Sequence, residues 1–243
     1  MCGRYVAARA AQDLATAFAA QVQVREGEQA PAVSWNVAPT DQVWGVVERR
    51  GEEAAEPVRQ LRPLRWGLVP SWAKSPSAGA KLINARAESV HEKPAFRKAF
   101  TTRRCLLPAD GYYEWETVPA TEHRKAAKKP YYLHPADGSL LAMAGLYEFW
   151  RDRSLPEDER EWIVSCTIIT TDATDSSGRV HPRMPLTIAP EHYAEWLDPD
   201  QHAPDDLRAL LALPSDGDLD LRPVPPTVNS VRNDGPELIA EAR

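Results

Sequence analysis

The chain has 243 residues, of which 43% are hydrophobic and 26% charged, values ordinary for a soluble globular protein with a core of its own. Its formal net charge of −6 argues against a general nucleic-acid coat, and no apolar run is long enough to cross a bilayer. The first residues lack the charged and apolar regions of a secretory signal, so we expect a cytoplasmic protein.

The charge is unevenly distributed along the chain. Between Gln60 and Arg104, ten Lys or Arg stand against two acids, a local balance of +8. From Thr187 to the end, four Arg stand against twelve acids, a balance of −8. A basic central segment on an acidic protein suggests one restricted anion-binding face, such as a site for a phosphate backbone. Charge alone supports a solvated helix face without a partner equally well.

The cysteines and histidines predict neither a disulfide framework nor a metal site. Cys2, Cys105 and Cys166 are odd in number, far apart and without a CxxC pair, which indicates a reducing compartment. The six histidines include no close-spaced pair. We therefore expect no metal and no cofactor.

The first third of the chain predicts one helix followed by extended segments. Residues 8–22 are alanine-rich with apolar residues at a four-residue spacing, a pattern typical of an amphipathic helix laid on a core. Residues 34–39 and 42–47 are predicted to be extended and partly buried, and residues 49–57 to form a polar hairpin tip or loop. The aromatic segment 64–72 is too interrupted by glycine and proline to be a helix.

The middle of the chain predicts a short helix and two strands. A proline suited to a first helical turn begins a helix over residues 94–102. Strands are expected over residues 105–108 and 112–116, with an Asp-Gly turn between them. The polar residues 117–129 predict a mobile loop.

The remaining elements are mostly strands. Residues 131–133 and 140–150, joined by a turn at Asp137-Gly138, predict a β-hairpin. The β-branched and apolar segment 162–171 is the clearest buried strand. Helices are then expected over residues 190–197 and 204–213, and a last strand over residues 221–228.

Strands without regularly alternating helices favour an α+β fold. We expect one β-rich domain over residues 1–243, with mainly antiparallel strands and peripheral helices. The motifs described below fall within residues 2–197, and residues 198–243 form an acidic C-terminal part.

The first five residues, Met-Cys-Gly-Arg-Tyr, offer an unusual reactive group. If Met1 is removed, Cys2 carries an α-amine and a thiol on adjacent carbons. Reference pKa values of about 8 and about 8.5 make both groups usable nucleophiles near neutral pH. Such a 1,2-aminothiol attacks an aldehyde through nitrogen, loses water to give an imine and closes a thiazolidine ring through sulfur. On these residues alone, a small second residue without a reactive role is the commoner interpretation.

A second group of candidates lies in the segment Lys81-Leu-Ile-Asn-Ala-Arg-Ala-Glu88. In an extended segment Asn84 and Arg86 share a face, because side chains alternate with period two. An amide can orient the terminal residue, while a guanidinium can hold a phosphate with two hydrogen bonds. An ordinary surface strand is the default alternative.

A third group lies in Gly111-Tyr-Tyr-Glu-Trp-Glu116. Alternation places Tyr113 and Trp115 on one face and Tyr112, Glu114 and Glu116 on the other. A carboxylate packed among aromatic rings is desolvated, which raises its pKa toward that of a general acid or base. Glu114 is the stronger candidate and Glu116 the weaker, and a cross-strand salt bridge is the alternative.

Two further segments follow the strongest predicted strand. Thr170-Thr-Asp-Ala-Thr174 offers hydroxyls and backbone amides to an anion, or forms a capping turn. In His181-Pro-Arg-Met-Pro185 two prolines hold a histidine and an arginine in a rigid extended loop. We interpret His181 as a second proton-transfer group and Arg183 as a phosphate contact, although a lone histidine is usually only a surface residue.

Five ordered motifs closely resemble those of the SOS response-associated peptidase (SRAP) family, whose members sense abasic sites in single-stranded DNA. They are residues 1–5 (MCGRY), 66–72 (WGLVPSW), 84–86 (NAR), 104–115 (RCLLPADGYYEW) and 181–185 (HPRMP). The resemblance implies that Cys2 forms a thiazolidine link with the opened sugar of an abasic site and shields the lesion. It also implies removal of the protein's own first methionine and a possible abasic-site lyase activity.

The same resemblance assigns roles to seven further residues. Asn84 is expected to position the terminal residue, Glu114 to shuttle protons, and His181 to stabilise or reverse the crosslink. Kinked single-stranded DNA is expected to be held by Arg4, Trp72, Arg86 and Arg183. We expect a monomer with abasic DNA as its partner and no membrane, and the sequence names no replication partner.

Two other functions remain open from the sequence. N-terminal-nucleophile glutamine amidohydrolases also begin Met-Cys-Gly, with the thiolate attacking an amide and the amine acting as base. That interpretation leaves the basic segment and the His181 loop unused. A non-covalent single-strand binder would use the aromatic residues and arginines alone.

Overall fold

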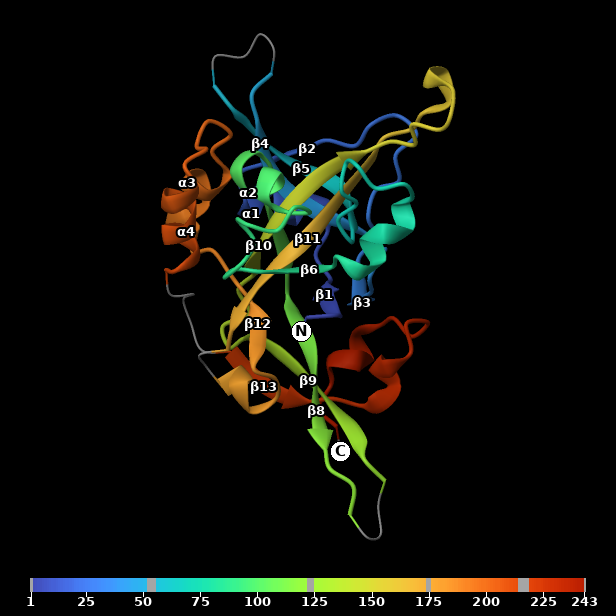
Figure 1. Cartoon of the computed structure of the whole chain (residues 1–243). Coiled ribbons are helices and arrows are strands. Elements are labelled where there is room, and N and C mark those ends of the chain that lie inside the picture. Colours follow the sequence, from blue (N-terminus) through green and yellow to red (C-terminus); the bar gives the residue numbers. More distant parts are fainter. Residues whose placement is uncertain (1, 52–55, 122–124, 174–175, 214–218, 243) are drawn as a thin grey trace.

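Two β-sheets and four short α-helices make up the described part of the chain, which comprises residues 2–51, 56–121, 125–173, 176–213 and 219–242 of a computed structural model (Figure 1). The five-stranded sheet, in spatial order, contains β13 (Leu219–Pro223), β9 (Ala127–Pro135), β8 (Gly111–Val118), β1 (Tyr5–Ala7) and β3 (Ser34–Val37). The eight-stranded sheet contains, in order, β12 (Arg183–Pro185), β11 (Ile163–Asp172), β10 (Leu141–Trp150), β7 (Arg104–Ala109), β4 (Gln42–Arg49), β5 (Val58–Trp66) and β2 (Gln21–Val22), with β6 (Asn84–Arg86) beside β11.

Most strand pairs are antiparallel, and only β2–β5, β5–β11 and β6–β11 are parallel among the described strands. The helices are α1 (Ala11–Ala17), α2 (Arg97–Thr102), α3 (Tyr193–Leu197) and α4 (Pro204–Leu211). The predicted α+β class with mainly antiparallel strands and peripheral helices is confirmed.

Three groups of buried side chains hold these layers together. The helix-side core joins α1 to α4 with one face of the eight-stranded sheet, through residues such as Leu14, Phe100 and Trp196. The inter-sheet core joins the opposite face to the five-stranded sheet and contains Cys2 and Trp66. Each face of the eight-stranded sheet is stabilised by its own set of apolar contacts. Burying apolar area of this kind contributes roughly 25 cal/mol per Å² to folding.

The C-terminal core covers the outer face of the five-stranded sheet. It brings Tyr113 and Tyr132 against Val224, Val228 and Leu238. In Figure 1 this last part of the chain (red) packs beside β8 and β9. The acidic C-terminal part is therefore integrated into the fold through its apolar residues.

Several predicted elements differ from the structure at their ends. The helix expected over residues 8–22 ends at Ala17, because Ala19 adopts the left-handed region at φ 49° and Gln21–Val22 then pairs with β5. The last strand ends at Pro223 rather than at residue 228, since Pro226 begins a 3-10 turn. The predicted strands at 105–108, 112–116 and 162–171 are confirmed within β7, β8 and β11.

Two predicted connections are wrong. The turn after Pro135 forms, but β9 and β10 belong to different sheets, so no hairpin joins them. Within residues 117–129, predicted as a loop, residues 117–118 and 127–129 instead extend the two strands of the β8–β9 hairpin, with Glu116 opposite Lys129 and Val118 opposite Ala127. Residues 122–124 lie outside the described part of the chain.

Candidate functional site

Cys2 lies in the inter-sheet core with none of its surface exposed. Its Sγ is 3.9 Å from the carbonyl oxygen of Arg4, and the start of the described chain lies between the two sheets near β6 (Figure 1). Burial raises the pKa of the Cys2 thiol far above its ordinary value, and the nearby carboxylate of Glu114 raises it further. The thiol is therefore protonated at neutral pH in this resting structure.

Asn84 holds the backbone of Cys2 in place. Its strand, β6, pairs in parallel with β11, with Asn84 opposite Ile168. From there the Asn84 Nδ2 donates to the carbonyl oxygen of Cys2 at 2.8 Å. The Asn84 Oδ1 is buried and has no hydrogen-bond partner among the described residues, so one amide acceptor remains beside the first residues of the chain.

Glu114 approaches Cys2 from the other sheet. The predicted alternation along β8 is confirmed, because Tyr112 belongs to the inter-sheet core whereas Tyr113 and Trp115 pack in the C-terminal core. Glu114 is only 4% exposed and lies opposite Tyr131 of β9. The negative charge of its carboxylate raises the pKa of the Cys2 thiol.

Glu116, the weaker carboxylate candidate, has a partner in the neighbouring strand. Its Oε2 accepts a hydrogen bond from the hydroxyl of Tyr131 at 3.0 Å. The ring of Tyr131 in turn lies 5.0 Å below the ammonium group of Lys129. This local set of contacts accounts for Glu116 as part of the β8–β9 hairpin.

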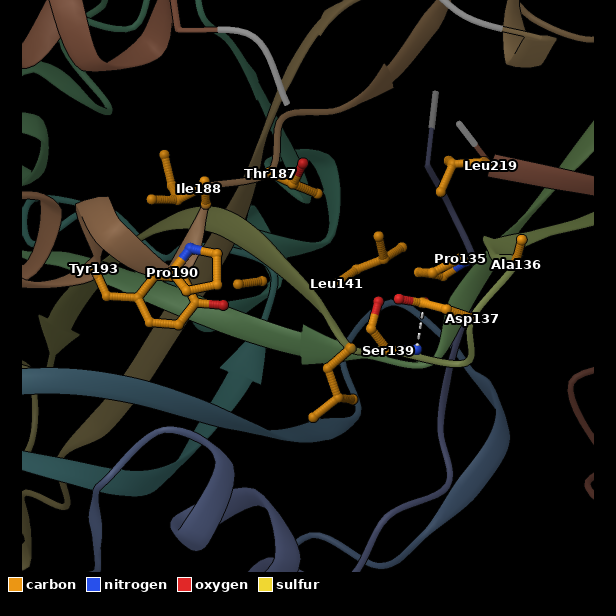
Figure 2. A pocket seen from close by; sticks show the side chains of 13 residues that line it. Pro135, Ala136, Asp137, Ser139, Leu141, Thr187, Ile188, Pro190, Tyr193 and Leu219 are labelled. Carbon is orange, nitrogen blue, oxygen red and sulfur yellow. Dashed lines mark hydrogen bonds between the residues drawn. The ribbon is translucent and has the colours of Figure 1, made fainter. Parts of the chain in front are cut away.

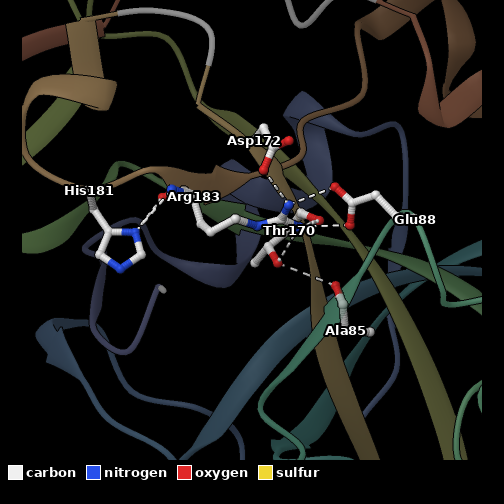
Figure 3. Close-up of polar contacts among 6 residues, drawn as sticks. All are labelled: Ala85, Glu88, Thr170, Asp172, His181 and Arg183. Carbon is white, nitrogen blue, oxygen red and sulfur yellow. Dashed lines mark hydrogen bonds and ion pairs between the residues drawn. The ribbon is translucent and has the colours of Figure 1, made fainter.

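His181, in the loop before β12, lies beside the backbone of Arg183, the first residue of β12 (Figure 3). His181 Nδ1 lies 3.0 Å from the backbone nitrogen of Arg183 and 3.2 Å from its carbonyl oxygen, so the Arg183 backbone holds the ring. The guanidinium of Arg183 donates to carboxylates and to the carbonyl oxygen of Thr170 at 2.6 Å. The short loop thus fixes the orientation of both side chains.

Two carboxylates bind the guanidinium of Arg183. Glu88 accepts two hydrogen bonds from it, at 2.6 and 3.1 Å, and Asp172 accepts a third at 2.7 Å. The hydrogen bond lowers the pKa of Glu88 and raises that of Arg183. A phosphate that binds Arg183 must therefore replace or join these two acids, neither of which the sequence analysis assigned to the site.

Three further residues, Arg4, Trp72 and Arg86, were predicted to contact a ligand, and they differ in exposure and in their contacts within the chain. Trp72 is 68% exposed, and Arg86 lies exposed at the end of β6, on the same face as Asn84. The guanidinium of Arg4 instead donates to Asn36 Oδ1 at 2.7 Å and to the carbonyl oxygen of Val228 at 3.1 Å. Arg4 therefore supports the fold, whatever else it contacts.

The threonine residues at the end of β11 have contacts within the chain. Thr170 is buried, and its carbonyl oxygen accepts both from Arg183 and from the backbone N–H of Ala87. Residues 174–175 lie outside the described part. The hydroxyl and carbonyl of Thr170 thus orient Arg183.

Sequence reasoning missed Asn36, which connects the N-terminal strand to the end of the chain. Besides accepting from Arg4, its Nδ2 donates to the carbonyl oxygens of Ser230 at 3.0 Å and Asn233 at 2.8 Å. A polar residue at a buried position of a predicted strand was the available signal.

A separate pocket of about 370 Å³ lies between the turn after β9 and the segment before α3 (Figure 2). It is lined mainly by apolar side chains such as Leu141, Ile188 and Tyr193, and contains none of the predicted site residues. Its few polar groups include Asp137, which accepts from the backbone N–H of Ser139 at 2.9 Å. We assign no chemistry to this pocket.

Within the described ranges, no group of three or more His, Cys, Asp or Glu side chains is arranged to hold a metal ion. All three cysteines are free and buried. None of the described helices is both long and apolar enough for a membrane span.

Comparison with known proteins places this arrangement in a family. A sequence model described as SOS response associated peptidase (SRAP) matches residues 1–231. The abasic site processing protein YoaM of Bacillus subtilis is 37% identical over 241 residues, covering 98% of this chain and 97% of its own. The abasic site processing protein HMCES of Gallus gallus is 30% identical, over 98% of this chain and 77% of its own.

The fold recurs in solved structures. A crystal structure of a Bacteroides thetaiotaomicron protein superposes with a TM-score of 0.80, over the full length of both chains, at 24% identity. A second crystal structure, of a Bordetella bronchiseptica protein, gives a TM-score of 0.69 at 25% identity, covering 92% of this chain and all of that one. With a family match over nearly its whole length, the chain belongs to the SOS response associated peptidase (SRAP) family.

Proposed function

We propose that this protein recognises abasic sites in single-stranded DNA and captures them covalently through Cys2 once Met1 has been removed. The single observation that carries the proposal is the hydrogen bond from Asn84 to the Cys2 carbonyl oxygen. The buried Glu114 carboxylate, which acts on the Cys2 thiol from the other sheet, supports it. The names of relatives such as YoaM and HMCES, which are abasic site processing proteins, support the choice of substrate.

The chemistry follows from the two nucleophiles of the terminal residue. An opened abasic sugar presents an aldehyde, whose carbon accepts the lone pair of the Cys2 amine to give a carbinolamine. Loss of the hydroxyl as water gives an imine. The sulfur then bonds to the same carbon while the imine nitrogen gains a proton, and a five-membered thiazolidine results, with one water released overall.

The raised pKa of the Cys2 thiol sets the order of these steps. A protonated thiol is a weak nucleophile, so the amine attacks first and sulfur closes the ring afterwards. Ring closure needs a base for the S–H proton, and loss of the hydroxyl needs an acid. Glu114 can serve both needs in succession: its carboxylate takes the proton that the nitrogen loses on attack, gives it to the leaving hydroxyl, and then takes the proton from sulfur.

His181 is assigned to the second proton transfer. Its Nδ1 is held by the backbone of Arg183, which orients the ring. Such a group can protonate the ring nitrogen or sulfur when the thiazolidine opens. We therefore assign His181 to stabilisation or reversal of the crosslink.

We assign binding of the DNA strand to one aromatic and three basic side chains. Trp72 is exposed enough to stack on a base or to wedge into the strand, and Arg86 is exposed on the same face of β6 as Asn84. Arg4 and Arg183 are included as phosphate contacts, although each already has partners within the chain.

Further activities belong to the same proposal. The protein would remove its own Met1, which gives it a peptidase activity, and breakdown of the imine by β-elimination would make it an abasic-site lyase. We also infer a cytoplasmic monomer that is associated with the nucleoid when bound to DNA. Residues 1–243 are proposed to act as a single domain, supported by the contacts of Asn36 with the C-terminal segment.

Intact-mass analysis of untagged protein, before and after mixing with an abasic oligonucleotide, tests the proposal. We expect loss of the Met1 mass and then an adduct one water lighter than the sum of protein and DNA. Cys2→Ala should give no adduct, and neither should protein with a tag before Cys2. Protein that still carries Met1 when fully competent would overturn the scheme, as would steady ammonia release from glutamine without any adduct.

A further inference from the structure

A basic and aromatic surface borders the inter-sheet core that contains Cys2. We call it the Trp162 patch and define it by Arg49, Arg62, Phe149, Arg151 and Trp162. Trp162 is 52% exposed and meets the ring of Phe149 edge-on, with centroids 6.1 Å apart. Arg151 lies 4.9 Å over the Trp162 ring and Arg49 lies 5.5 Å over the Phe149 ring.

Three arginines, Arg49, Arg62 and Arg151, bring positive charge to the patch. Burial lowers the pKa of Arg62, and repulsion from Arg25 and Arg49 lowers it further. Within the described ranges, Arg49, Arg62 and Arg151 form no ion pair with a carboxylate, and Glu28 only partly offsets the repulsion at Arg62. Clustered cations beside rings attract an anion that also has flat apolar groups.

The patch is continuous with the site along the strands. Phe149 and Val164 pack against the inter-sheet core that contains Cys2. On β11, Ile168 lies opposite Asn84 and Val164 lies opposite Phe149, and four residues of strand separate them by about 13 Å. A strand fixed at Cys2 can therefore reach the patch with a short length of chain.

A hollow links the patch to Trp72. The indole N–H of Trp150 donates to the carbonyl oxygen of Ala73 at 2.7 Å, which ties the end of β10 to the loop that bears Trp72. The hollow between them, about 470 Å³, is lined by Trp72, Lys74 and Arg151 among others. Arg151 thus borders both the hollow and the ring of Trp162.

We propose that the Trp162 patch is a non-covalent binding subsite for the single strand that flanks the lesion. Bases stack on Trp162 and Phe149, and phosphates bind Arg49, Arg62 and Arg151. An unpaired strand fits better than a duplex, because exposed aromatic side chains stack on free base faces, whereas duplex bases already stack on one another. This subsite rests on the proposed function, since it presumes that the lesion is held at Cys2.

The test uses oligonucleotides with an abasic site at one end and extensions of increasing length on the 5′ or the 3′ side. Wild-type affinity before crosslinking should rise once an extension on one side reaches the patch. Trp162→Ala should remove about 10-fold of that gain, the scale of one lost stacking contact. Arg151→Glu should also flatten the gain and lower the salt dependence by about one ion.

Arg97→Glu is the matched control, because Arg97 is exposed on α2, which packs on the opposite face of the sheet. It should keep the full gain with length, and Trp162→Phe should restore most of what Trp162→Ala loses. If the affinities of Arg151→Glu and Arg97→Glu rise equally with extension length, the subsite is overturned. An affinity gain seen only with a duplex extension would also overturn it. If wild-type protein binds long strands through the patch but never forms an adduct, the proposed function fails while the patch stands.

Discussion

The side-chain amide of Asn84 donates to the carbonyl oxygen of Cys2 at 2.8 Å across 82 residues of sequence. That carbonyl is bonded to the carbon that carries both the backbone nitrogen and the CH₂–SH group of Cys2. One hydrogen bond from β6 therefore orients the backbone of Cys2.

Replacing Asn84 with Ala should slow adduct formation with abasic DNA by at least about five-fold, the effect of losing one hydrogen bond of about 1 kcal/mol. The physical reason is a wider range of orientations for the terminal amine. The rate is measured at saturating DNA on denaturing gels. Arg86→Ala, two positions along the same strand, should weaken initial binding instead, and equal rates for Asn84→Ala and wild type would contradict the positioning role.

Replacing Glu114 with Gln should lower the crosslinking rate at neutral pH by about 10²-fold, the lower end of general acid–base effects. The same change should make the thiol of Cys2 more acidic. The Glu114 carboxylate raises the pKa of Cys2, so its removal lets the thiolate form at a lower pH than in the wild type.

The pH dependence of Cys2 alkylation, followed by mass spectrometry, measures the second effect. Glu116→Gln is the control, because Glu116 lies on the same strand but hydrogen-bonds to Tyr131. An unchanged midpoint in Glu114→Gln would place the carboxylate too far from sulfur to take its proton.

Replacing His181 with Ala should change the rate of crosslink formation or reversal by about 10²-fold and leave DNA affinity nearly unchanged. The imidazole is held by the Arg183 backbone and serves proton transfer rather than phosphate binding. Reversal is followed by transfer of the protein from a labelled to an unlabelled abasic strand. A variant that loses affinity alone would show that the assignment is mistaken.

Replacing Glu88 with Gln should increase affinity for single-stranded DNA about two-fold to five-fold, within the range of one exposed charge pair. The carboxylate now binds the guanidinium of Arg183 through two hydrogen bonds and repels a phosphate that approaches it. The gain should be larger at low salt. Weaker binding in Glu88→Gln would indicate that the ion pair holds Arg183 in its binding position.

The same ion pair should contribute to stability only above mildly acidic pH. Because Arg183 lowers the pKa of Glu88 in the folded state, the contribution is complete above the unfolded pKa of about 4.3. It is lost as the pH falls through the lowered folded value. Glu88 is about half exposed, so the difference in unfolding free energy between wild type and Glu88→Gln should stay below about 1 kcal/mol and vanish at low pH.

The sequence predicted local structure better than long-range pairing. The alternation of Tyr112 to Trp115 follows from strand geometry, and the structure buries the two faces in separate cores as expected. The hairpin predicted around Asp137 failed because a turn signal specifies the local backbone but not the sheet that the next strand joins.

The candidate site shows the same division. The family resemblance predicted that Asn84 positions Cys2, and in the structure the two residues share a hydrogen bond. The carboxylates around Arg183 could not be predicted, since Glu88 lies in the turn after β6, Asp172 ends β11, and the two meet only through the parallel register of these strands. Asn36 was missed because its partners are carbonyl groups, which carry no sequence signature.

Arg4 and Asn36 connect the N-terminal segment to carbonyl oxygens at Val228, Ser230 and Asn233. Arg4 and Val228 are 224 residues apart in the sequence. During synthesis, a nascent chain therefore cannot complete the support beside Cys2 until these late residues have emerged from the ribosome and folded back.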